Sequence, residues 1–203
     1  MLLVLASLFI ITIIISRALK KDKNTAEKAL DEYFAREHQA NRTRKQPLDD
    51  LSYVEIPFAF IPKSLLEDNA SVQDCHETLE RLSDKKIVNF TGYTNTDLKF
   101  QYGVANLPTL MAYDENYTLY ARTIYKLAKL YYENGYESNA RILLEKAVES
   151  GTDITGNYTL LASIYQAQGQ QDKITALIAW ADQLRSASKT NIKRSLEEYV
   201  RND

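Results

Sequence analysis

The chain contains a single cysteine, Cys75, next to one of its two histidines, His76. A thiol beside an imidazole is the pair that a nucleophilic cysteine enzyme needs. Neighbouring residues on a helix, however, point about 100° apart, so these two side chains cannot readily act on one another. Val72, Cys75, Leu79 and Leu82 recur at spacings of three and four. This pattern predicts a helix with the thiol packed in its core.

Other chemistries with recognisable signatures find no support. With His38 as the other histidine, a histidine-based metal site is poorly supported. The 6 glycines form neither a GxxxxGK[ST] nor a GxGxxG motif, and no serine-hydrolase elbow is present. A net charge of -2 lacks the basic footprint of nucleic-acid binding. We therefore expect no enzyme, with no catalytic, metal-binding or cofactor-binding residue, no cofactor and no nucleic-acid partner.

A second set of residues is suited to binding. Arg122, Tyr125, Lys129 and Tyr132 are spaced by three and four, so one helix face would present two cations beside two phenol rings. Such a face could recognise an acidic segment or a terminal carboxylate. The alternative is an ordinary solvated helix face.

These residues lie in a stretch that repeats with a period of 34 residues. Shifted by 34, small, aromatic and turn residues coincide in the pairs Leu127 and Leu161, Ala128 and Ala162, Tyr131 and Tyr165, Gly135 and Gly169, and Ala147 and Ala181. Ala140 departs from this rule, because Ile174 takes its place. A 34-residue period in a helical sequence is typical of the tetratricopeptide repeat (TPR), and the spacing resembles that family closely.

The resemblance covers two repeats, at about 121–154 and 155–188. Both lack the usual closing proline, with Thr152 in its place in the first repeat, where Ile124 also replaces the usual tryptophan. The resemblance implies helical hairpins whose first helices line a concave groove for peptides or partner helices. On that analogy the groove residues would be Arg122, Tyr125, Lys129, Tyr132, Thr159, Ser163 and Gln166. The family's carboxylate clamp, with lysine and asparagine across three repeats, is not found.

The first fifteen residues, MLLVLASLFIITIII, are almost wholly apolar. Arg17, Lys20, Lys21 and Lys23 follow this run and no basic residue precedes it. We expect a transmembrane anchor at 1–19, in contact with the lipid bilayer. By the positive-inside rule the protein would be a single-pass cell-membrane protein with a cytoplasmic body. The alternatives are a cleaved signal peptide, suggested by small residues around Arg17, and a buried core helix.

Residues 20–46 predict a juxtamembrane amphipathic helix and linker. Ala26, Ala29, Leu30, Tyr33 and Phe34 form its apolar stripe. We expect a stalk helix that packs on the domain behind it, since its polar face mixes acids with bases; the alternative is a helix that lies on lipid or docks on a partner.

Residues 47–120 predict an N-terminal module of helical and extended segments. Pro57 and Pro62 favour an extended segment that lies along a surface. Ile87, Val88 and Phe90 could form a short strand or continue the preceding helix. The stretch NLPTLMAYDENYTLYA, at 106–121, predicts a helical element, interrupted by Pro108, that packs on the first repeat without being a true repeat.

The last segment, 189–203, predicts a capping helix, since two repeats rarely bury a core alone and about three are normally needed. Its apolar side would be formed by Ile192, Leu196, Tyr199 and Val200. The expected fold is therefore all-α: an α-α superhelix with two TPR-like hairpins at 121–188, extra N-terminal helices with a short extended segment, and a transmembrane helix. The expected function is a membrane-tethered TPR-like scaffold or adaptor of bacterial type, which binds a protein or peptide that could be acidic. The alternative is an exported or envelope-facing TPR protein.

Overall fold

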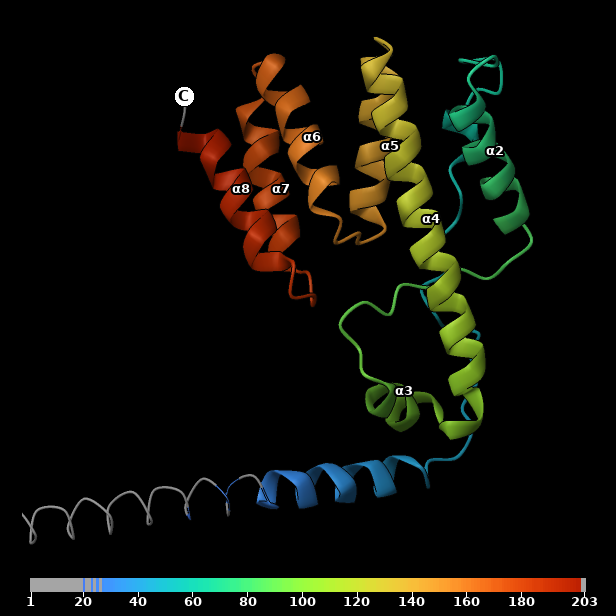
Figure 1. The fold of residues 1–203 in the computed structure, drawn as a ribbon, viewed down its shortest axis with the longest axis vertical. Helices are drawn as coiled ribbons and strands as arrows, with labels where there is room; N and C mark the ends of the chain where they lie inside the picture. Colours follow the sequence, from blue (N-terminus) through green and yellow to red (C-terminus); the bar gives the residue numbers. More distant parts are fainter. Residues whose placement is uncertain (1–19, 21–22, 24, 26, 202–203) are drawn as a thin grey trace, which may run out of the picture. The chain divides into compact units, whose positions relative to one another are not determined.

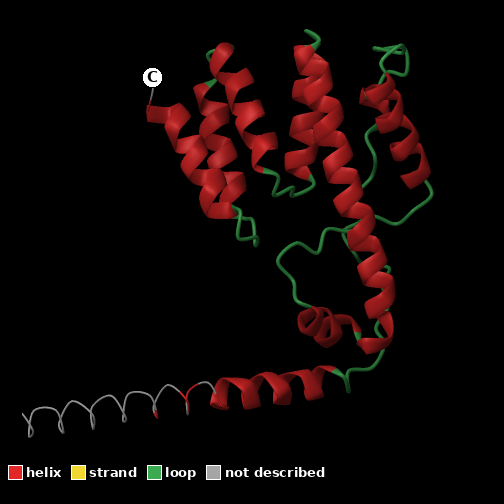
Figure 2. Ribbon diagram, viewed as in Figure 1, coloured by secondary structure: helices red, strands yellow, loops and turns green. Residues whose placement is uncertain are grey.

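The computed structural model describes residues 20, 23, 25 and 27–201, so the predicted anchor at 1–19 lies outside the described residues. Within them the chain is helical and contains no strand (Figure 2), which confirms the all-α class. Among these residues, no helix combines the length and the apolar character needed to cross a bilayer.

The chain divides into two compact units. The first joins the described residues up to Gln46 with Asn95–Asn106, and the second joins Pro47–Thr94 with the described residues from Leu107 onward. Residues 95–106 therefore belong to the first unit, whereas the sequence pattern placed them in the segment 47–120.

In the first unit, residues 27–40 are helical and are tied to α3 (Asn95–Tyr102), which η2 (Val104–Asn106) follows. The Arg36 guanidinium donates a hydrogen bond to Asp97 at 2.6 Å. The Glu37 carboxylate accepts one from the Thr96 hydroxyl at 2.6 Å and also pairs with Lys99. These two interactions hold the pKa of Glu37 below its usual range, and the hydrogen bond from Lys99 has the larger effect.

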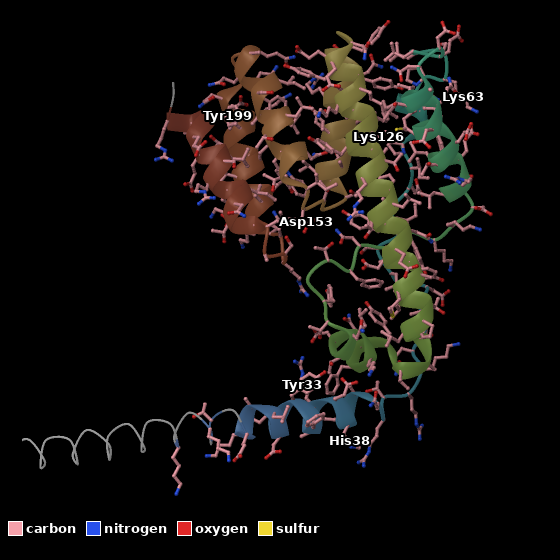
Figure 3. The ribbon with its side chains drawn as sticks, in the orientation of Figure 1. Tyr33, His38, Lys63, Lys126, Asp153 and Tyr199 are labelled. Atoms are coloured by element: carbon pink, nitrogen blue, oxygen red, sulfur yellow. The ribbon has the colours of Figure 1, made fainter. Side chains whose placement is uncertain are left out.

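The predicted apolar stripe of this helical segment is exposed. Leu30, Tyr33 and Phe34 are each more than half accessible, with Tyr33 at 56%. Figure 3 shows Tyr33 and His38 extending from different sides of the segment. The buried stripe expected of a packed stalk helix is therefore not observed, because the ion pairs to α3 begin at Arg36, after the stripe. Ala26 lies outside the described residues.

In the second unit, residues 52–57 form the predicted extended segment, followed by η1 (Phe58–Phe60). An isolated antiparallel bridge pairs Tyr53 with Val88, and the Val54 N–H donates to the Ile87 carbonyl at 2.9 Å. Residues 87–90 are thus extended, and they do not continue the preceding helix.

Helix α2 (Ala70–Leu82) has the core face that its spacing predicts. The Asn69 side chain caps its first turn by accepting from two backbone N–H groups. Val72, Cys75, Leu79 and Leu82 are all buried in the core of the second unit.

The other helices of the second unit are α4 (Leu107–Glu133), α5 (Glu137–Glu149), α6 (Thr155–Ala167), α7 (Gln171–Asp182) and α8 (Lys189–Arg201). Consecutive helices pack side by side, and α8 also contacts α6 (Figure 1). Helix α4 runs through the predicted boundary at 120/121. Pro108 does not interrupt it, because proline in the first helical turn loses no intrahelical hydrogen bond.

The two hairpins, α4–α5 and α6–α7, have similar turns, at Gly135 and Gly169. Gly135 and Gly169 both have positive φ, 85° and 66°, a conformation that glycine adopts without steric cost. After each glycine the next N–H donates back into the first helix, from Tyr136 to Tyr131 and from Gln170 to Tyr165, both at 2.9 Å. The core of these hairpins includes Ala128, Tyr131, Ala140, Ala147, Ala162, Tyr165, Ile174 and Ala181.

Candidate functional site

A hollow of about 280 Å³ lies among α4, α6 and α8. It brings together five of the predicted groove residues, namely Tyr125, Lys129, Tyr132, Thr159 and Ser163. Arg122 is exposed on α4 and Gln166 is half-buried on α6, and neither lines the hollow. We call this hollow the tyrosine groove.

Four further residues line the tyrosine groove and were not predicted to do so: Glu133, Gly156, Leu160 and Tyr199. Tyr199 comes from α8, which Figure 3 shows at the C-terminal end of the helix row. The sequence pattern assigned Tyr199 to the inner face of a capping helix. That the same ring reaches the groove depends on how α8 crosses α6, a relationship that no spacing encodes.

The charges of the tyrosine groove are largely balanced. The Lys129 ammonium lies 3.6 Å from the Glu133 carboxylate, one turn along α4. The hydroxyl of Ser163 donates to the Leu160 carbonyl at 2.8 Å, and that of Thr159 donates to the carbonyls of Thr155 and Gly156 at 3.3 Å. These hydroxyls can therefore accept hydrogen bonds from a partner, while the phenols of Tyr125 and Tyr132 supply apolar contact area.

The cysteine–histidine pair occupies the core. Cys75 is 1% exposed, and burial raises the pKa of its thiol. The His76 ring nitrogen Nε2 lies 3.4 Å from the hydroxyl oxygen of Tyr131, and burial lowers the pKa of His76. A buried thiol with a raised pKa is a poor nucleophile, which matches the predicted packing role of Cys75.

Within the described part of the chain, no group of three or more histidine, cysteine, aspartate or glutamate side chains is arranged to hold a metal ion.

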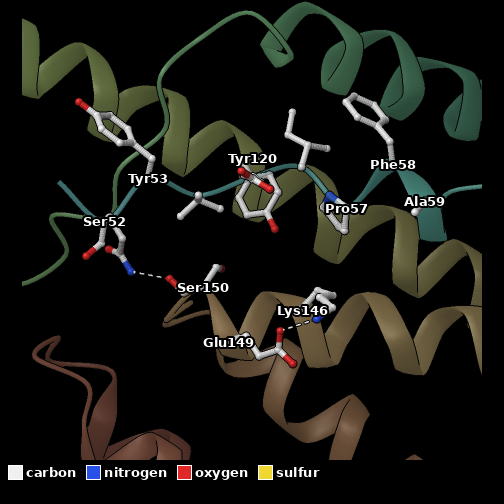
Figure 4. A pocket seen from close by; sticks show the side chains of 13 residues that line it. Ser52, Tyr53, Pro57, Phe58, Ala59, Tyr120, Lys146, Glu149 and Ser150 are labelled. Atoms are coloured by element: carbon white, nitrogen blue, oxygen red, sulfur yellow. Dashed lines mark hydrogen bonds and ion pairs between the residues drawn. The ribbon is translucent and has the colours of Figure 1, made fainter. Parts of the chain in front are cut away.

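A larger hollow, of about 640 Å³, lies beside the extended segment 52–57 (Figure 4). Its opposite wall is the last turn of α5, where Lys146 and Glu149 form an ion pair at 2.6 Å. The buried ring of Tyr120 lines it too, and desolvation raises the pKa of that phenol to about 12. The sequence placed an extended segment here, but the opposite wall comes from a helix distant in the chain.

Comparisons with protein-family models, curated proteins and solved structures returned no match. What the protein binds must therefore be inferred from the geometry and chemistry of its own surfaces.

Proposed function

We propose that the protein is a membrane-tethered protein–protein interaction module, a TPR-like scaffold or adaptor that holds a partner at the cytoplasmic face of the cell membrane. The recurrence of both hairpin turns at a spacing of 34 residues supports the TPR-like repeat. Helix α8 then serves as the cap that a short repeat array requires, because it buries Ile192 and Leu196.

The observation that carries this proposal is the tyrosine groove. Its lining side chains come from three helices, and three of them are tyrosines. Tyrosine offers a large, rigid contact area with few rotatable bonds, so it can bind a polypeptide at low entropic cost. The preferred partner is a peptide or helix, and the role of the protein is to bind without catalysis.

An acidic partner would find its countercharge on α4. Arg122 is exposed and makes no hydrogen bond or ion pair with the rest of the described chain. Lys129 is already offset by Glu133. We therefore assign contact area to the tyrosine groove and charge preference chiefly to Arg122 beside it.

The membrane tether in this proposal is the apolar segment 1–19, and the basic residues that follow it favour a cytoplasmic body. Full-length protein with a C-terminal tag should remain with membranes at high salt, because salt screens electrostatic attraction and does not weaken the insertion of an apolar segment into the bilayer. Protease added to intact cells should spare the tag. Cleavage of the tag from outside would contradict the cytoplasmic orientation.

Site-specific photo-crosslinking tests the groove in the same cells. A photoreactive amino acid at Tyr132 should crosslink a discrete partner. The same group at Ala179, which is exposed on α7 away from the groove lining, is the matched control. Equal crosslinking at both positions, or none at Tyr132, would refute the groove as the binding surface, whatever the tag experiment shows.

A further inference from the structure

One edge of the extended segment 52–57 has unused main-chain hydrogen-bonding groups. The Val54 N–H donates to the Ile87 carbonyl, which lies in the neighbouring segment of the same chain. In an antiparallel pair, successive residues direct their main-chain groups to alternate edges, so Tyr53 and Glu55 face the other edge. The Glu55 N–H and carbonyl make no hydrogen bond with any other described residue, and neither does the Tyr53 carbonyl.

Glu55, whose main-chain groups are unused, is one of the residues that line the large hollow. Its lining joins residues 52–59 to Asn89, to Tyr120 and to the end of α5, where Lys146, Glu149 and Ser150 lie. A separate hollow of about 350 Å³ lies on the paired side, where the segment meets 82–87. Figure 4 shows the segment on one side of the larger hollow and α5 on the other.

Both walls of the hollow are held in place. On one side, Val54 and Ile56 pack against the core, and the Tyr53 hydroxyl donates to the Leu48 carbonyl at 2.7 Å. On the other, the Ser150 carbonyl accepts hydrogen bonds from the Asn89 amide and the Tyr117 hydroxyl, both at 3.1 Å. A preformed site loses little conformational entropy when it binds.

We propose that this hollow binds a short peptide in extended conformation, which adds to the segment as a further strand by pairing with the Tyr53 carbonyl and with the N–H and carbonyl of Glu55. The Tyr53 N–H takes no part, because it donates to the Leu51 carbonyl at 2.8 Å. An exposed strand edge with unpaired N–H and carbonyl groups is a template for this mode of recognition. Pro57 has no N–H, so the pairing is confined to a few residues. Phe58, which lines the hollow just after the segment and is 41% exposed, selects an apolar side chain next to the paired stretch.

This site goes beyond the tyrosine groove. It uses η1, the segment before it and α5, and it needs neither the membrane tether nor the residues of α6 and α8. A protein with both sites joins two polypeptides.

The test uses the full-length chain in mild detergent and a displayed library of random heptapeptides as the probe. A selected peptide is synthesised, and its affinity is measured for wild type, Glu55→Pro and Glu55→Ala. Proline removes the main-chain donor at position 55, whereas alanine keeps it. We expect Glu55→Pro to weaken binding roughly 10-fold and Glu55→Ala to leave it within about 2-fold.

A second measurement does not depend on how Glu55→Pro folds. N-methylation at each position of the peptide in turn should weaken binding to wild type at alternate residues, the period of a paired strand. Three results would each overturn the proposal. The selected peptides could bind Glu55→Pro with unchanged affinity, N-methylation could weaken binding equally at every position, or the library could yield no binding peptide. If Tyr132→Ala weakens the binding of the selected peptides instead, they bind in the tyrosine groove, and this result would also overturn the proposal.

Discussion

The phenol of Tyr125 lies so close to Gly156 that a β-carbon at position 156 would stand 2.2 Å from the tyrosine hydroxyl oxygen. Tyr125 belongs to α4 and Gly156 to the first turn of α6. Glycine within a helix costs about 0.5–1 kcal/mol relative to alanine. Its presence here is explained by the room it leaves for a ring that forms one wall of the tyrosine groove.

This contact predicts a change of sign. In the wild type, Gly156→Ala should be neutral or destabilising, because the gain in helix propensity is offset by displacing the phenol. In a Tyr125→Ala background the same change should stabilise by about 0.5–1 kcal/mol. Urea denaturation of the four proteins in this cycle measures the coupling. An equal effect of Gly156→Ala in both backgrounds would mean that the ring does not meet the backbone there.

The small residues within the hairpins should not tolerate enlargement. Ala128 and Ala162 are fully buried. Ala128→Leu and Ala162→Leu should each destabilise by about 1–3 kcal/mol, because added methylene groups overpack a helix–helix contact. Ala179→Leu makes the same chemical change at an exposed position of α7 and should alter stability by less than about 0.5 kcal/mol. Thermal melts that place all three variants together would argue against the hairpin packing.

Charge reversal at and beside the tyrosine groove should weaken the binding of an acidic partner. The double change Arg122→Glu with Lys129→Glu should reduce affinity for the crosslinked partner at least ~10-fold, because it turns attraction into repulsion. A control with the same change in net charge is Lys85→Glu with Arg194→Glu, both exposed outside the groove lining. Titration calorimetry at two salt concentrations measures both. Equal loss in both double variants would indicate a general charge effect.

His76 should make stability depend on pH. Burial is the main cause that lowers its pKa, so the unfolded chain takes up this proton at a higher pH than the folded chain does. Neutral His76 therefore makes its full contribution to folding stability when the pH is above the ordinary histidine pKa of about 6.5. This contribution is lost as the pH falls below that value and through the lowered pKa of the folded state.

The variant His76→Gln should lack this dependence. The stability difference between wild type and His76→Gln should shrink as the pH is lowered from about 7 to about 5. Thr78→Val, a change at a buried non-titrating residue of the same helix, should keep a constant difference from wild type. Urea midpoints across this range measure both variants, and parallel curves for His76→Gln would contradict the assignment.

Local sequence pattern determined the buried helix faces and the turns of the two hairpins. Alanine at 128 and 162, tyrosine at 131 and 165, and glycine at 135 and 169 specify which face of a helix is buried and where the chain turns. These properties follow from helical periodicity and from the backbone freedom of glycine, both of which act within a few residues. For the same reason the core position of Cys75 could be predicted from the residues nearby.

Tertiary structure decided which distant residues meet. Pro108 reads locally as an interruption, yet it lies in the first turn of α4, where its missing N–H costs nothing. Asp97 and Lys99 join the helical segment 27–40 because Arg36 and Glu37 provide their countercharges. Tyr199 enters the tyrosine groove because α8 packs against α6, and α5 forms the wall of the hollow opposite the segment that contains Glu55. Spacing along one helix fixes a face, whereas the meeting of two elements depends on the packing angle between them.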